Sequence, residues 1–210
     1  MSRREYWEKI YGNQKGNDVS WYQPRLQRSL DLILSTGIGP DARIIDVGGG
    51  TSTLVDDLVD RGFRHVTVVD IAEAPLDAAQ KRLGERASQV AWQVGDVTAL
   101  DFPRDSFDLW HDRAVFHFLT SDVDRKAYLE RVCCAVRQGG HVVLATFGPQ
   151  GPEQCSGLPV VRYSAGELHA AFGPAFRLVE HVEERHRTPW GTEQEFVYCL
   201  CTRERECDVS

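Results

Sequence analysis

The stretch that decides the fold is Asp46-Val-Gly-Gly-Gly-Thr-Ser52, which overlaps the end of the short apolar run at 43–47. Residues 51–61 have a helical pattern, so the glycines form a tight turn between a strand and a helix. Such turns lie at the carboxyl edge of an open α/β sheet, where ligands bind. Glycines let a ligand approach the backbone closely, and the helix N-terminus favours an anionic group. The alternative interpretation is a tight turn without a ligand.

The alternation of strand and helix continues along the chain. Short, nearly continuous apolar runs separated by helical patterns predict a parallel sheet that is covered on both faces. The C-terminal third breaks this rhythm, because a turn at 188–191 separates two strand patterns and predicts an antiparallel pair. The expected strands are 43–47, 65–70, 90–94, 106–110, 141–147, 176–182 and 195–201, and the expected helices after the first turn are 73–83, 123–136 and 165–172.

The first 40 residues differ from the rest in their aromatic content. A helix is expected over 2–11, and a second one opens at Pro24 and stops at Gly37. We predict one domain, made of a helical lid (1–40), a catalytic core (41–202) and a flexible tail (203–210).

Composition narrows the classes of protein that this chain can be. The 210 residues carry a net charge of −7, which argues against nucleic-acid and membrane partners. No run of 18 apolar residues and no signal-peptide pattern occurs, so we expect a soluble, cytoplasmic protein. The six cysteines have no C-x-x-C spacing, and we expect mostly free thiols and no metal site.

Acidic residues after three successive strands indicate which ligand the turn holds. A Walker loop is excluded because no Lys-Ser/Thr follows the glycines, and Thr53 replaces the last glycine of a dinucleotide fingerprint. Asp70 can accept both ribose hydroxyls of an adenosine, a device that NAD enzymes share. Asp96 can accept the adenine amino group, and Asp46 can meet an ammonium group. S-adenosylmethionine (SAM) combines these features.

The sequence resembles the class I, seven-strand SAM-dependent methyltransferases over about residues 40–202. The resemblance implies a three-layer Rossmann-like sandwich with a mostly parallel seven-strand sheet, an antiparallel C-terminal hairpin and two N-terminal helices as a lid. It also implies SAM as cofactor and S-adenosylhomocysteine (SAH) as product. Ser52 departs from the first motif, where the family has glycine. The motifs are Asp46-x-Gly48-x-Gly50-x-Ser52, Val68-Val-Asp70, Gly95-Asp96-Val97, Phe107-Asp-Leu-Trp-His-Asp112 and Arg137-Gln-Gly-Gly140.

Three groups of candidate residues follow. The lid aromatics either cover the cofactor or only staple the first helix onto the core, and Asp112 with Arg113 either serves the substrate or forms an internal pair. Cys155, in the long loop 148–160, is either an exposed thiol near the site or a plain loop residue. The cofactor candidates are Asp46, Gly48, Gly50, Asp70, Ile71, Asp96, Val97 and His111; the catalytic candidates are Asp112, Arg113 and His117; the lid candidates are Trp7, Tyr11, Trp21 and Tyr22.

The acceptor is expected to be a small molecule that takes the methyl group by in-line displacement. A thiol or sulfide is favoured because the expected site has few bases, and a thiolate needs little beyond alignment. The Trp7-Glu-x-x-Tyr11 opening and Trp110-His-Asp-Arg-Ala114 resemble two subgroups, the thiol and thiopurine S-methyltransferases and the small protein-lysine methyltransferases. A protein-lysine N-methyltransferase is therefore the alternative. A nicotinamide-dependent oxidoreductase and a non-catalytic scaffold protein with the same fold are hypotheses of other classes.

Overall fold

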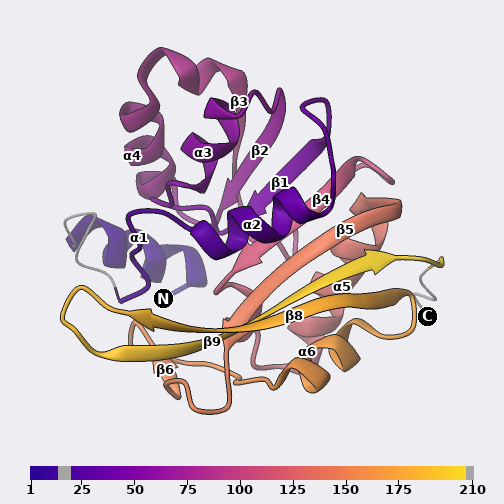
Figure 1. The fold of residues 1–210 in the computed structure, drawn as a ribbon. Helices are drawn as coiled ribbons and strands as arrows, with labels where there is room; N and C mark the ends of the chain where they lie inside the picture. The colour runs from indigo at the N-terminus through magenta and orange to yellow at the C-terminus, as the bar shows by residue number, and fades with distance from the viewer. Residues whose placement is uncertain (14–19, 207–210) are drawn as a thin grey trace.

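The centre of the protein is a seven-stranded sheet, seen in a computed structural model that describes residues 1–13 and 20–206 (Figure 1). The strand order is β3-β2-β1-β4-β5-β9-β8. The first five strands of this order are parallel, while β9 runs antiparallel to β5 and β8 antiparallel to β9. The expected sheet with its C-terminal hairpin is confirmed. The strands are β1 Arg43–Val47, β2 His65–Asp70, β3 Val90–Val94, β4 Phe107–Arg113, β5 Val136–Phe147, β8 Phe176–Arg187 and β9 Glu193–Arg203.

Helices cover both faces of the sheet and complete a three-layer sandwich. One apolar cluster joins α2, α3 and α4 to one face, and a second cluster joins α5 and α6 to the other. The first helix, α1, lies apart from both layers, beside α4 (Figure 1). The helices are α1 Arg3–Asn13, α2 Gln27–Ser35, α3 Leu54–Asp60, α4 Glu73–Leu83, α5 Asp122–Ala135 and α6 Ala165–Phe172, with short 3-10 turns at Gly84–Gln89 and Phe116–Phe118.

Neighbouring residues of the central strands point to opposite faces of the sheet, and both faces are buried. Ile44 packs with the α2–α4 cluster and Ile45 with the α5–α6 cluster, and both side chains are fully buried. Leu109 and Trp110 of β4 divide in the same way. Burial on both sides explains why these strands read as continuous apolar runs.

The strand order places a crevice at the carboxyl ends of β1 and β4. β1 pairs with β2 on one side and with β4 on the other, so the winding of the chain reverses between β1 and β4. Ligands of open α/β sheets bind at this switch point. The glycine turn and the ends of β2, β3 and β4 therefore meet at one edge.

The structure extends several expected elements. β4 and β5 are longer than the sequence predicts, as are both strands of the hairpin. Arg203 closes β9, and its guanidinium donates to Asp105 Oδ1 at 3.1 Å, so this residue is part of the sheet and not of a tail. Residues 207–210 of the expected tail lie outside the described residues. The loop 148–160 contains a two-residue strand pair, β6 Gln154–Cys155 and β7 Leu158–Pro159.

Two further expectations can be compared with the fold. Cys134, Cys155, Cys199 and Cys201 are free thiols as expected, whereas Cys133 is disulfide-bonded. Within the part of the chain that the structure describes, no helix is long and apolar enough to cross a membrane.

Candidate active site

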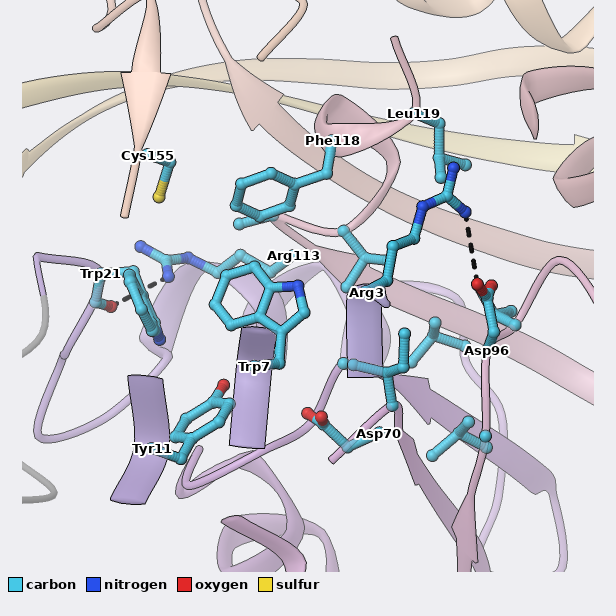
Figure 2. A pocket seen from close by; sticks show the side chains of 18 residues that line it. Arg3, Trp7, Tyr11, Trp21, Asp70, Asp96, Arg113, Phe118, Leu119 and Cys155 are labelled. Carbon is cyan, nitrogen blue, oxygen red and sulfur yellow. Dashed lines mark hydrogen bonds and ion pairs between the residues drawn. The ribbon is translucent and has the colours of Figure 1, made fainter. Parts of the chain in front are cut away.

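A pocket lies over the carboxyl ends of the central strands, beneath α1 (Figure 2). Its cavity volume is about 110 Å³. A second hollow adjoins it at the glycine turn and shares several lining residues with it. The shared residues are Tyr11, Trp21, Val47, Gly48 and Arg113.

The glycine turn contributes space to the pocket. Gly48 has φ +67°, and a Cβ placed there would lie 2.0 Å from Val115 Cγ2, so only glycine fits without a shift of that side chain. The N–H groups of Gly48 and Gly49 donate to Val69 O at 2.7 and 3.2 Å. These two amides fasten the turn to β2 and are not free donors for a ligand carboxylate.

Asp70 ends β2 at the floor of the pocket, where Figure 2 shows it below Trp7 and beside Tyr11. Its Oδ1 accepts the Ala72 N–H at 3.0 Å, and the Gly50 N–H also donates to the carboxylate. Burial raises the pKa of Asp70 to about 7, and the nearby charges of Asp46 and Glu8 act in the same direction. A carboxylate in this position can accept the hydroxyls of a ribose.

Asp46 is held from behind by a chain of buried polar groups. His111 Nδ1 lies 2.7 Å from Asp46 Oδ1, and His111 Nε2 lies 2.9 Å from the Ser29 hydroxyl of α2. Both ring nitrogens of His111 are thus used inside the protein. Among the described residues Asp46 Oδ2 has no hydrogen-bond partner, although it is buried. This oxygen is an open acceptor beside the second hollow, suited to an ammonium group.

The far end of the pocket is formed after β3. Asp96 Oδ1 accepts from the Thr98 N–H and hydroxyl at 2.9 and 2.7 Å, which fixes the carboxylate. Its Oδ2 faces Arg3 Nη1 of α1 at 3.3 Å, the contact drawn in Figure 2. Ile71 and Val97 line the same end and can pack on a flat ring.

The lid aromatics both cover the pocket and pack on one another. Trp7 makes edge-to-face contacts with Trp21 and Phe118, with ring centroids 6.1 and 5.1 Å apart. Trp7, Tyr11 and Trp21 line the main pocket, and Tyr22 lines the second hollow. These side chains therefore both fix α1 to the core and cover the pocket, so the two interpretations are compatible. The second expected lid helix, α2, instead packs on the sheet through Leu30, Leu32 and Ile33.

Polar contacts of α1 side chains, among them Arg3, Tyr6 and Glu8, hold α1 over the pocket. Arg3, the first residue of α1, forms ion pairs with both Asp96 and Asp124 and so links the helix to the core. Glu8 accepts the backbone N–H of Glu73 at 2.7 Å, at the first residue of α4. A helix N-terminus is a favourable site for a carboxylate. The Tyr6 hydroxyl donates to the carbonyl of Ser156 in the 148–160 loop.

Of the three catalytic candidates, only Arg113 lines the pocket. Residues alternate along β4, so Asp112 faces α5, where its carboxylate accepts the Tyr128 hydroxyl at 2.6 Å and the N–H groups of Val115 and Phe116. His117 is fully buried, and burial lowers its pKa to about 3. Asp112 and His117 shape the loop after β4 and do not line either hollow. The expected pair between Asp112 and Arg113 is not formed.

Cys155, in the loop 148–160, also lines the pocket. It is 3% exposed, and burial raises the pKa of its thiol to about 11. The group is therefore a neutral thiol at physiological pH. Cys155 lines the pocket, but it is buried and not the exposed thiol that one interpretation of the sequence expects.

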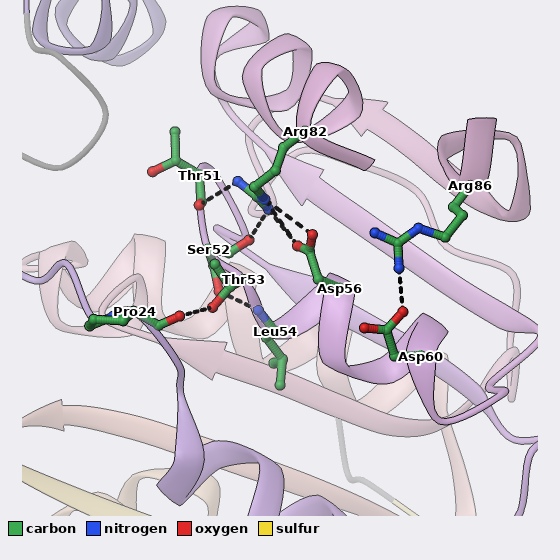
Figure 3. Close-up of polar contacts among 9 residues, drawn as sticks. All are labelled: Pro24, Thr51, Ser52, Thr53, Leu54, Asp56, Asp60, Arg82 and Arg86. Carbon is green, nitrogen blue, oxygen red and sulfur yellow. Dashed lines mark hydrogen bonds and ion pairs between the residues drawn. The ribbon is translucent and has the colours of Figure 1, made fainter. Parts of the chain in front are cut away.

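Arg82 is a supporting residue that the sequence does not reveal (Figure 3). From α4 it donates to the carbonyls of Thr51 and Ser52 at 2.9 and 2.6 Å, and its guanidinium also pairs with Asp56 of α3 at 2.7 Å. The end of the glycine turn is thus braced from outside the pocket. Nothing in the spacing of an exposed helical arginine distinguishes this role from an ordinary surface pair.

Comparison with known proteins agrees with this architecture. Residues 44–140 match the family model of a methyltransferase domain, and this range holds the glycine turn, Asp70, Asp96 and all of β4. This match and the seven-stranded fold make the chain similar to class I SAM-dependent methyltransferases. The family's cofactor is SAM.

The relatives that this chain resembles are named for different acceptors. The eEF1A lysine and N-terminal methyltransferase of Danio rerio is 29% identical over 124 residues, 59% of this chain and 18% of that protein. The malonyl-[acyl-carrier protein] O-methyltransferase of a Paenibacillus species is 29% identical over 157 residues, 72% of this chain and 51% of that protein. The chain thus spans about a fifth of the first relative and half of the second.

A solved structure shows the same fold with ligands bound. The 1,6-didemethyltoxoflavin-N1-methyltransferase of Burkholderia thailandensis, in complex with its substrate and SAH, aligns with a TM-score of 0.66 at 21% identity. The alignment covers 96% of this chain and 84% of that one. At this identity the likeness establishes the fold and leaves the acceptor open.

Proposed function

We propose that this protein transfers a methyl group from SAM to a small-molecule nucleophile. The observation that carries the proposal is the set of three carboxylates in two adjoining hollows, with Asp70 and Asp96 in the main pocket and Asp46 in the second. When bound, SAM supplies an electrophilic methyl group on a sulfonium sulfur, and the protein's task is to align an acceptor with it and exclude water.

The residues present fit the cofactor. The open Asp46 Oδ2 would hold the ammonium group, Asp70 the ribose hydroxyls, and Asp96 with Ile71 and Val97 the adenine. Gly48 lines both hollows with its backbone, and the Val115 side chain packs where a Cβ would otherwise lie. The aromatic rings of Trp7, Trp21 and Phe118 lie together at the pocket and would shield the sulfonium of SAM from water.

The enclosed pocket supports a small acceptor. α1 and the loop at Cys155 meet over the hollow, through the bond from Tyr6 to Ser156, and this narrows the access of a folded protein. The lining offers no histidine in the main hollow, and its thiol is neutral, so an acceptor that needs no strong base is favoured. A thiol or sulfide meets that condition. Protein-lysine methylation is the second candidate, which the eEF1A methyltransferase relatives favour.

The first test is cofactor binding. We expect SAH and SAM, and not NAD or NADP, to raise the melting temperature, by the linkage of binding to folding. Asp70→Ala should weaken SAH binding by at least about tenfold in calorimetry, roughly 1.4 kcal/mol, with the fold intact. Asp77→Ala, an exposed carboxylate on α4, is the control and should bind SAH normally.

The second test separates the acceptor classes. Radiolabelled methyl-SAM is incubated with a panel of small thiols and, separately, with a protein lysate. Label in a small product supports the proposal. Label only on a polypeptide band contradicts the small-molecule acceptor, and normal SAH binding by Asp70→Ala contradicts the assigned ribose site.

A further inference from the structure

Arg113 is a buried cation that the cofactor assignment does not use. Its side chain ends β4 and lines both hollows, with the residue 8% exposed. Nε donates to the Tyr198 hydroxyl at 3.0 Å, Nη1 donates to the carbonyl of Trp21 at 3.1 Å, and Cζ lies 4.2 Å from the centre of the Phe196 ring. All three partners are neutral, so the guanidinium is held in place without being neutralised.

No carboxylate neutralises this guanidinium within residues 1–13 and 20–206. Arg113 has no ion pair there, and its Nη2 has no hydrogen-bond partner. The carboxylate that comes near, Glu184, accepts the Tyr198 hydroxyl at 3.0 Å and reaches Arg113 only through that group. An unpaired buried charge costs several kcal/mol, so a buried arginine with a free N–H at a pocket indicates a missing anion.

The titratable neighbours of Arg113 do not supply that anion. Burial lowers the pKa of His117 and His186 and keeps both rings neutral at physiological pH. Burial raises the pKa of Cys155 to about 11 and that of Tyr198 to about 12, which keeps the thiol and the phenol neutral as well. The carboxylates that line the same hollows, Asp46, Asp70 and Asp96, form no ion pair with Arg113 in the described residues and are assigned to the cofactor, so the guanidinium has no anion of its own.

We propose that the acceptor of this enzyme is an anionic small molecule whose negative charge is bound by Arg113 Nη2. The inference rests on the proposed methyl transfer and narrows its substrate class. Two cations, the guanidinium and a sulfonium, would repel each other in one dry pocket, and an anion between them relieves this repulsion. A protonated lysine would add a third positive charge, so the same residue disfavours the protein-lysine alternative. The charge is either a carboxylate on the acceptor or the nucleophile itself as a thiolate.

The test measures anion binding separately from turnover. The SAH-loaded protein is titrated with benzoate and with benzyl alcohol, which share a ring and differ in charge. We expect benzoate to bind at least about tenfold more tightly than benzyl alcohol. Arg113→Met should abolish this preference. Arg113→Lys should restore part of it, because lysine keeps the positive charge but lacks the paired N–H donors of the guanidinium. Arg177→Met removes an exposed arginine that pairs with Glu204 and should change neither affinity.

Transfer assays distinguish the two sources of charge. If Arg113 binds a carboxylate, 4-(mercaptomethyl)benzoate is methylated faster than benzyl mercaptan. If it binds the nucleophile, thiophenol is preferred to benzyl mercaptan, and Arg113→Met moves the rate profile to higher pH.

Three outcomes would overturn the inference. Equal affinity of the wild-type protein for benzoate and benzyl alcohol would show that no anion site exists, whether or not the variants fold. A tenfold loss of SAH affinity in Arg113→Met would assign the guanidinium to the cofactor's own carboxylate. Failure of the wild-type protein to bind SAH would instead refute the proposed function, and this inference with it.

Discussion

At the scale of single residues, the fold and the proposed function place opposite demands on the protonation of Asp70. The fold buries its carboxylate beneath α1, which favours the protonated form and raises its pKa to about 7 from an ordinary value of 3.8. Ribose hydroxyls are donors and need the ionised form as acceptor. The protein therefore keeps a partly protonated acid at the place where the ligand requires a carboxylate.

This conflict predicts the pH dependence of cofactor affinity. The folded, unliganded protein holds the Asp70 proton below pH 7, and binding must release it, so SAH affinity should rise with pH and level off above about 7. Between pH 5.5 and 7 the dissociation constant should fall by about 15-fold in total, with the slope decreasing as the pH approaches 7. Calorimetry in buffers of different ionisation enthalpy would also show about one proton released at pH 6. A flat profile over this range would contradict the assigned pKa or the ribose contact.

Two variants act as controls for that profile. Asp70→Asn has no proton to release, so its weaker SAH binding should not vary between pH 5.5 and 8. Asp108→Asn changes an acid outside the pocket, whose pKa is lowered to about 2 by Arg43 and Arg137, and it should keep the wild-type pH profile.

At the scale of elements, α4 supports the glycine turn without touching the ligand. We expect Arg82→Ala to weaken SAH binding by about three- to tenfold, or roughly 0.7–1.4 kcal/mol. The carbonyls of Thr51 and Ser52 lose their brace, and the partial exposure of the Arg82 side chain limits the loss. Calorimetry measures the affinity.

Arg86→Ala is the matched control for the brace. Arg86 follows α4 and pairs with Asp60, one turn beyond Asp56 on α3, as Figure 3 shows, but it does not reach the turn. This variant should bind SAH as the wild type does. An equal loss of affinity in both variants would show that the packing of α3 on α4, and not the brace, governs the site.

The sequence predicts elements well where burial on both faces makes a pattern clear. β1, β2 and β3 have the expected bounds, and so do α4 and α6. The sequence underestimates the length of the hairpin strands. Because β8 is mostly exposed, its polar residues beyond 182 give no apolar strand pattern. Side-chain direction is the harder problem. The alternation along β4 could separate Arg113 from Asp112, but the partners of Asp112, such as Tyr128, come from distant elements.

At the scale of the whole molecule, the two halves of the chain close the site together. α1 from the N-terminus and the loop at Ser156 from the C-terminal third meet above the switch point between β1 and β4. The apolar core lies below this layer and does not include α1. Polar contacts and the ring contacts of Trp7 with Trp21 and Phe118 hold α1 in place. We therefore expect closure over the ligand to depend on contacts that the buried core does not need.

Releasing α1 should thus change ligand kinetics more than stability. We expect the double variant Arg3→Met and Glu8→Ala to speed SAH dissociation by about three- to tenfold, since it removes the bonds of α1 to Asp96, to Asp124 and to the start of α4. The unliganded melting temperature should fall by less than about 4 °C, because exposed pairs contribute about 1 kcal/mol or less. Stopped-flow fluorescence can follow dissociation through Trp7, which lines the pocket.

The control for this prediction is Arg64→Met, which removes an exposed pair with Asp41 away from the pocket. It should leave the dissociation rate unchanged. If the double variant instead loses stability in proportion to its loss of SAH binding, α1 is an integral part of the folding unit, and the closed site forms only when the whole molecule folds.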